Sequence, residues 1–210
     1  MNFGRFAFLH TGGSNTIDNL RITVARPVPV DWLFVGDSIT SGMRALGQEQ
    51  SWTECAARRI YGNSVMFAES GAVSADVCRA WPWLTNVYQP KNIVFMLGGN
   101  DWFFSVPADT FASNYVWLNT NSTAHNVINC FPTARSAALG LTNLVECLRT
   151  NTPVSSQVDL FTATVDTVGK LYEGYDPGDH IHPNSQGHSV MGAVLADYLA
   201  QWPTNRARLW

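Results

Sequence analysis

The chain has 210 residues, of which 46% are hydrophobic and 14% charged, and its formal net charge is −3. This length suits a single domain of about 100–200 residues, and the apolar content excludes the composition of a disordered chain. The slightly negative charge gives no electrostatic reason to expect a nucleic-acid partner. The longest apolar run, residues 93–97, is far shorter than the roughly 18 residues of a membrane-spanning helix, so we expect a soluble protein.

The first 26 residues differ in pattern from the rest of the chain. Residues 16–24 partly alternate apolar and polar side chains, as a half-buried strand does. Pro27 and Pro29 then disfavour a helix and favour an extended linker. We predict a β-strand or hairpin extension at residues 1–26 and the main domain at residues 27–210. The given chain shows no signal-peptide pattern, and its compartment stays open, secretion included.

The four cysteines carry no metal-site pattern. Cys55, Cys78, Cys130 and Cys147 form neither a CxxC motif nor close Cys/His pairs. They allow three disulfide connectivities, which the sequence does not rank. Because free cysteines are commonly buried, we predict plain buried thiols.

After the linker, strand and helix patterns alternate along the chain. Short apolar runs indicate strands, and apolar residues at helical spacing indicate helices. In chain order, we expect a strand at residues 32–35, a helix at 50–61, a strand at 65–68, a helix at 75–83, a strand at 93–97, a helix at 108–118, a strand at 127–130, a helix at 136–149, a strand at 158–161 and a helix at 185–201. This alternation predicts an α/β fold with helices on both faces of a parallel sheet.

Polar residues and glycines follow the predicted strands. Ser38 follows the first strand, Gly71 the second, Asn100 the third, and Asp179 and His182 follow the last. Ligands of parallel α/β sheets bind beyond the carboxyl ends of the strands. We therefore expect these residues to meet at one edge of the sheet.

Together, these residues have the chemistry that acyl transfer requires. A serine hydroxyl such as Ser38 becomes a nucleophile when a base takes its proton, and His182 suits that role. Asp179, three residues before the histidine, can fix its tautomer and orientation. The backbone amides of Ser38 and Gly71 and the side-chain amide of Asn100 are candidate oxyanion donors. This chemistry needs no metal.

The sequence resembles the SGNH hydrolases, also called the GDSL esterase and lipase family. The four blocks of that family occur in order, as Gly36-Asp37-Ser38 with Ile39 in place of the usual Leu, Gly71, Gly98-Gly99-Asn100-Asp101, and Asp179 to His182. The resemblance covers about residues 30–202. It implies a three-layer, flavodoxin-like α/β/α fold with a five-stranded parallel sheet of order 2-1-3-4-5. It also implies cofactor-free ester hydrolysis through an acyl-serine intermediate.

By position, the resemblance assigns Ser38 as the nucleophile and Asp179 and His182 as the other members of a catalytic triad. It assigns Gly71 and Asn100 as oxyanion donors. Three of these residues have a structural alternative, since Ser38 also suits a helix N-cap, Gly71 a positive φ angle and Asn100 a turn.

Several neighbouring residues have more than one interpretation. His180 is the rival of His182, but it directly follows Asp179, and adjacent side chains diverge in an extended loop. Asp37 either braces the turn or contacts substrate. Trp102 and Phe103 follow Asn100 and are candidates for the wall of a substrate pocket, although aromatic residues at a strand end are more often core. His188 is expected to be structural.

The substrate expectation is a short-chain acyl ester, with carbohydrate O-acetyl esters first. It rests on aromatic residues near the site, which suit sugar rings, and on the resemblance of residues 1–26 to the last strand of a carbohydrate-binding sandwich. A lysophospholipase, thioesterase or lipase is the alternative if a long apolar groove begins at Ser38. A non-catalytic phosphate or flavin binder would use the loop after the first strand but leaves Asn100 and His182 without a role. The oligomeric state stays open.

Overall fold

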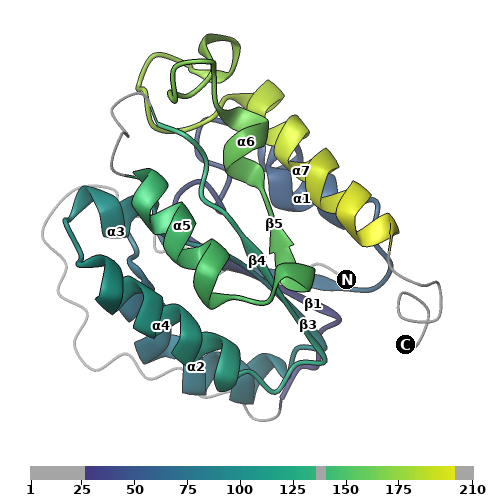
Figure 1. Cartoon of the computed structure of the whole chain (residues 1–210). Coiled ribbons are helices and arrows are strands. Elements are labelled where there is room, and N and C mark those ends of the chain that lie inside the picture. The colour runs from purple at the N-terminus through teal and green to yellow at the C-terminus, as the bar shows by residue number, and fades with distance from the viewer. Residues whose placement is uncertain (1–26, 136–140, 202–210) are drawn as a thin grey trace, which may run out of the picture.

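A five-stranded parallel sheet lies between two layers of helices in the computed structural model, which describes residues 27–135 and 141–201 (Figure 1). The strands are β1 (Trp32–Gly36), β2 (Ser64–Ala68), β3 (Asn92–Met96), β4 (Asn126–Cys130) and β5 (Gln157–Val158). They pair in the order β2-β1-β3-β4-β5, and every pairing is parallel. The predicted fold class and strand order are confirmed. The extension predicted at residues 1–26 lies outside the described residues.

Helices connect the strands. They are α1 (Trp52–Ala57), α2 (Ser74–Tyr88), α3 (Gly99–Phe103), α4 (Ala108–Thr120), α5 (Leu141–Asn151), α6 (Leu160–Thr164) and α7 (Ser185–Ala200), with short 3-10 turns η1 (Gln48–Gln50), η2 (Val154–Ser156) and η3 (Glu173–Tyr175). Helices α2, α4 and α5 lie on one face of the sheet and α1 and α7 on the other (Figure 1). The start of the helix predicted at residue 136 lies outside the described residues.

The core has two halves because alternate strand residues point to opposite faces of the sheet. In β1, Leu33 and Val35 pack in the cluster formed with α2, α4 and α5. Trp32 and Phe34 pack in the cluster formed with α1 and α7. All residues of β1 and β3 are buried, which explains their almost continuous apolar sequences.

The segment around β5 differs from the prediction. β5 contains only residues 157–158, and Leu160 and Phe161, predicted as strand, begin helix α6 instead. Asp159 caps this helix, because its Oδ1 accepts a hydrogen bond of 2.8 Å from the Thr162 backbone N–H. A short apolar run fits either a strand or a helix, and here the N-cap decides for the helix.

Two other helices were not fully predicted. Helix α2 runs through Pro82 to Tyr88, beyond the predicted end at residue 83, and burial of Leu84 and Val87 stabilises the added turns. Helix α3 covers residues 99–103, which were expected to be a loop. It places the residues after β3 over the end of the sheet.

The four cysteines are free thiols. Cys130 is buried and the other three are half-buried.

Among the helices of residues 27–135 and 141–201, none is long and apolar enough to span a membrane.

Candidate active site

Ser38 lies in a tight turn at the carboxyl end of β1. Gly36 begins this turn, where a Cβ atom would lie only 2.0 Å from Thr40 Oγ1 and 2.7 Å from the Met96 carbonyl oxygen. Asp37 Oδ1 accepts a 3.0 Å hydrogen bond from the Ile39 N–H, and the Ser41 hydroxyl donates to the Ser38 carbonyl at 2.7 Å. These bonds fix the backbone on both sides of the Ser38 side chain.

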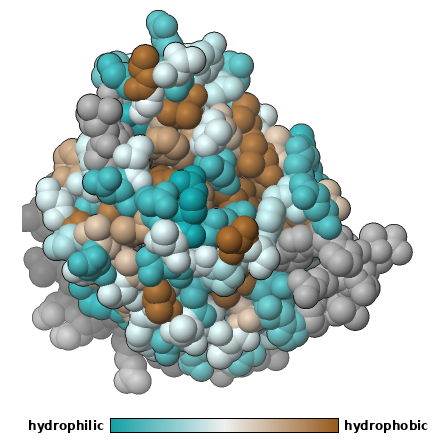
Figure 2. All heavy atoms as spheres, in the orientation of Figure 1, coloured by the Kyte–Doolittle hydropathy of each residue, from teal (hydrophilic) through white to brown (hydrophobic). Residues whose placement is uncertain are grey.

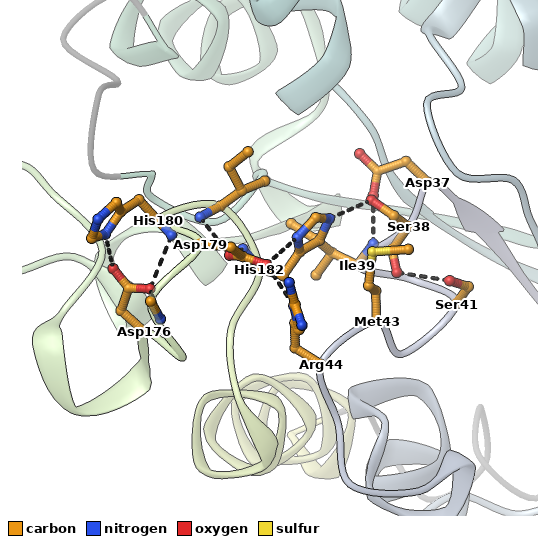
Figure 3. A network of polar contacts seen from close by, with 12 residues as sticks. Asp37, Ser38, Ile39, Ser41, Met43, Arg44, Asp176, Asp179, His180 and His182 are labelled. Carbon is orange, nitrogen blue, oxygen red and sulfur yellow. Dashed lines mark hydrogen bonds and ion pairs between the residues drawn. The ribbon is translucent and has the colours of Figure 1, made fainter.

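Ser38, His182 and Asp179 form a continuous chain of hydrogen bonds (Figure 3). Ser38 Oγ lies 2.9 Å from His182 Nε2, and His182 Nδ1 lies 3.0 Å from Asp179 Oδ2. An ionised carboxylate only accepts hydrogen bonds, so Nδ1 carries the proton and Nε2 is left to accept the serine hydroxyl proton. The fold thus joins residues 144 positions apart in the chain in the order that base-assisted attack by serine requires.

Asp179 is held by its own loop and by an arginine. Its Oδ1 accepts hydrogen bonds from the backbone N–H groups of Ile181, at 3.0 Å, and His182, at 2.9 Å. Its Oδ2 also accepts from Arg44 Nε at 2.7 Å. Partial burial alone would raise the pKa of Asp179, but the His182 N–H, Arg44 and the Ile181 N–H outweigh burial and hold it well below its usual range. The carboxylate is therefore ionised at neutral pH.

The structure distinguishes His182 from the two nearby histidines, His180 and His188. His180 is exposed, and its Nδ1 lies 2.5 Å from Asp176 Oδ2, away from Ser38 (Figure 3). His188 is fully buried on α7, where its Nε2 donates to the Met43 carbonyl at 3.0 Å and its Nδ1 accepts from the Trp52 N–H at 3.3 Å. Only His182 meets Ser38, and His188 has the structural position expected for it.

The candidate oxyanion donors differ in how free they are. Within the described residues, neither the Ser38 N–H nor the Gly71 N–H has a hydrogen-bond partner. Gly71 adopts a φ of +84°, which favours glycine, and a Cβ there would meet nothing within 4 Å. The Asn100 Nδ2 group donates to the Ala72 carbonyl at 3.0 Å and to Asp37 Oδ2 at 3.3 Å. An oxyanion at Asn100 therefore has to share an amide that Asp37 already orients.

Asp37 is a buried partner of Asn100. Only 3% of its side chain is accessible, and the equally buried Arg135 lies 3.9 Å away, measured from Nη2 to Oδ2. Burial raises the pKa of Asp37, and the charge of Arg135 opposes this rise. Burial and the bond to the Ile39 N–H fit the interpretation that Asp37 braces the turn, and its contact with substrate stays a prediction.

Arg135 is a residue that sequence reasoning missed. It follows β4 at the same edge of the sheet, and its Nε and Nη2 atoms have no hydrogen-bond partner in the described residues. A Cβ on residue 99 would lie 2.1 Å from Arg135 Nη2, so glycine at position 99 makes room for the guanidinium. The signal that the sequence offers is its position after a predicted strand, at the edge where the other polar residues lie.

Asp101, the last residue of the third block, is structural. It is fully buried, and its carboxylate accepts hydrogen bonds from the Ser74 hydroxyl at 2.6 Å and the Ser74 backbone N–H at 3.1 Å. Burial raises its pKa, and the bonds from Ser74 oppose the rise. Asp101 therefore ties helix α3 to the start of α2, close to Gly71.

The aromatic candidates separate into core and surface. Trp102 is half-buried and packs against the cluster of α2, α4 and α5. Phe103 is 59% exposed and lies edge-on to the equally exposed Phe104, with ring centroids 5.1 Å apart. Phe103 stays a candidate for substrate contact, and so does Trp102, whose packing against this cluster also fits the alternative of a core residue. The described residues include no cluster of three or more His, Cys, Asp or Glu side chains suited to a metal ion.

Comparison with known proteins identifies a matching family and structures of similar fold. The sequence profile of the GDSL-like lipase/acylhydrolase family matches residues 34–190, most of the chain. Among curated proteins, none matches the chain in sequence.

Three solved structures illustrate the similarity in fold. One is a member of the G-D-S-L lipolytic protein family from Veillonella parvula, with 20% identity, a TM-score of 0.67, and coverage of 81% of this chain and 98% of that one. A lipase from a goat rumen metagenome has 16% identity and a TM-score of 0.67, covering 81% and 97%. A catalytic mutant of an acetylxylan esterase from Geobacillus stearothermophilus has 17% identity and a TM-score of 0.64, covering 85% and 96%.

Proposed function

The chain belongs to the GDSL-like lipase/acylhydrolase family and is a carboxylic ester hydrolase, and we propose that Ser38 is its nucleophile. The observation that carries this proposal is the hydrogen-bonded series Ser38 Oγ, His182 Nε2, His182 Nδ1 and Asp179 Oδ2, with distances of 2.9 and 3.0 Å. A phosphate or flavin binder has no need for this series. A serine esterase needs each member of it.

In the proposed reaction, Ser38 Oγ attacks the ester carbonyl while His182 Nε2 takes the hydroxyl proton. The carbonyl oxygen becomes negative and is stabilised by the N–H groups of Ser38 and Gly71 and by the Asn100 amide. The C–O bond to the alcohol then breaks, and the imidazolium returns its proton to the leaving oxygen. Water, deprotonated by the same imidazole, attacks the acyl-serine carbonyl. The C–O bond to Ser38 Oγ breaks, the imidazolium returns its proton to that oxygen, and the carboxylic acid is released. Asp179 stays ionised throughout and stabilises the imidazolium.

For the substrate, we favour short acyl esters of carbohydrates. The support is a surface hollow of about 560 Å³ that includes Gly71 and is lined largely by polar and charged residues, among them Glu69, Asp76 and Arg79. Hydroxyl-rich substrates suit such a lining, whereas a long acyl chain needs an apolar groove. On the face seen in Figure 2, hydrophilic and hydrophobic residues are interspersed.

A lysophospholipase, thioesterase or lipase activity is the second candidate. It is favoured by exposed apolar side chains that follow β1 and β3, namely Leu46 in the loop after β1 and Phe103 and Phe104 at the end of α3. These residues offer contacts to an acyl chain that the hollow beside Gly71 does not.

The first experiment compares the wild type with Ser38→Ala on nitrophenyl esters of increasing acyl length and on acetylated xylan. We expect Ser38→Ala to lower kcat by about 10⁴-fold or more. The exposed Ser189 on α7 gives a matched control, and Ser189→Ala should keep full activity. An organophosphonate should label Ser38 stoichiometrically. Appreciable turnover by Ser38→Ala would overturn the assignment, and preference for long chains without acetate release from xylan would replace the carbohydrate ester by the second candidate.

A further inference from the structure

Arg44 contacts the candidate catalytic carboxylate from the rim of the site (Figure 3). Its Nε lies 2.7 Å from Asp179 Oδ2, the same oxygen that lies 3.0 Å from His182 Nδ1. One carboxylate oxygen thus accepts from a guanidinium and an imidazole together. The Arg44 side chain is 54% exposed, so its charge faces the solvent side of the pair.

The backbone around Arg44 is fixed in an unusual conformation. Arg44 has a φ of 70°, in the left-handed region that few residues other than glycine adopt. On one side, the Met43 carbonyl accepts a 3.0 Å hydrogen bond from buried His188, and on the other, the Leu46 N–H donates to Ser185 Oγ at 2.8 Å. Both partners lie on α7, next to the loop of Asp179 and His182. An unfavourable backbone conformation persists only where surrounding contacts hold it in place. Here the two hydrogen bonds to α7 hold the backbone on both sides of Arg44, and its side chain reaches Asp179.

This arrangement changes how strongly Asp179 stabilises a protonated imidazole. An acceptor oxygen shared with a guanidinium has less negative charge available to the imidazolium, and the arginine charge itself repels the imidazolium. We propose that Arg44 is a positioning residue that orients Asp179 and keeps His182 unprotonated, and therefore active, to a lower pH. This inference rests on the proposed role of His182 as the base.

Other charged groups near the pair do not duplicate Arg44. Asp37 and His188 interact electrostatically with His182, and Arg135 with Asp179, and all three are buried. None of the three donates a hydrogen bond to Asp179 within the described residues. The low pKa of Asp179 is consistent with the contact from Arg44.

The test is the pH dependence of kcat/KM for Arg44→Gln, measured on an uncharged acetyl ester. Loss of the charge should move the midpoint of the acidic limb upward by roughly 0.5–1 pH unit, as expected for two like charges that contact the same carboxylate near the surface. Arg44→Lys keeps the charge and should bring the midpoint most of the way back. The matched control is Arg149→Gln, which removes a half-exposed arginine paired with Glu146 on α5 and should leave the midpoint unchanged.

A second readout does not depend on turnover. In a Ser38→Ala background, the His182 ring resonances should titrate at higher pH once Arg44 is replaced by glutamine, and those of exposed His180 should not move. An unchanged acidic limb together with an unchanged His182 titration would overturn the role of Arg44. If the wild type lacks Ser38-dependent esterase activity, the proposed function fails, whereas the resonance titration still decides the electrostatic role of Arg44.

Discussion

Two arginine–aspartate pairs flank Ser38, and they differ in almost every physical respect. Arg44 and Asp179 lie at the rim, 2.7 Å apart, with 54% and 19% of their side chains exposed. Arg135 and Asp37 lie 3.9 Å apart beneath the site, and each is 3% exposed. The pKa of Asp179 lies below its usual range because of hydrogen bonds that outweigh burial, whereas burial raises that of Asp37.

The difference separates two tasks of the site. In the proposed reaction, the rim pair lies beside the groups that exchange protons, which substrate and water must reach. The buried pair lies beneath Asn100, a proposed oxyanion donor, where contact with water would weaken each polar interaction. We therefore expect substitutions in the rim pair to change the pH profile, and substitutions in the buried pair to change stability and transition-state binding.

The largest expected effect on stability is that of Arg135→Met. It leaves the Asp37 carboxylate buried without a compensating charge, so the free energy of unfolding should fall by about 3–5 kcal/mol. Arg44→Gln is the control from the exposed pair and should cost at most about 1 kcal/mol. Urea unfolding of both variants measures the contrast.

A double variant sharpens this prediction. Because Arg135 compensates Asp37, the loss for Arg135→Met with Asp37→Asn should be smaller than the sum of the two single losses. Equal losses for Arg135→Met and Arg44→Gln would show that burial does not distinguish the pairs.

Asn100→Ala tests the catalytic side of the buried network. Removal of one oxyanion donor should lower kcat by about 10²–10³-fold, which corresponds to about 2.7–4 kcal/mol of transition-state stabilisation. KM should change much less, because the donor acts on charge that develops in the transition state. Steady-state kinetics with the preferred ester decide this, and a loss confined to KM would mean that Asn100 only binds the ground state.

The smallest expected effect is in the acid dependence of stability. The pKa of Asp179 is lower in the folded state than its unfolded value of about 4, so its contribution is present above that pH and is lost on acidification. The pKa of Asp37 is raised, so its contribution changes in the opposite direction. On going from pH 6 to pH 3, the stability difference between wild type and Asp179→Asn should shrink, and that between wild type and Asp37→Asn should grow. Urea midpoints across this range test both signs, and parallel curves for all three proteins would contradict them.

Much of the fold could be predicted from local patterns. Strands such as β1 and β3 are buried on both faces, so their composition alone identifies them. Helix α6 could not be distinguished from a strand by its apolar residues, because the decisive signal was the side chain of Asp159 before them.

The candidate site could be predicted only where local sequence patterns mark its residues. Ser38, Asn100 and His182 follow strand ends or stand in short motifs, which the sequence displays directly. Arg44 lies 135 residues from its partner Asp179, and no local pattern signals that contact. Arg135 follows β4, so its position at the edge of the sheet could be predicted from the sequence. Its proximity to Asp37 could not, because it depends on how the side chains pack in three dimensions.

The close approach of residue 99 to Arg135 has an evolutionary consequence. Since any side chain at position 99 would occupy the volume that the guanidinium fills, the two positions compete for one space. In homologous chains, a larger amino acid at the position of Gly99 should therefore be accompanied by a shorter one at the position of Arg135, and Asp37 should then lose its charge as well.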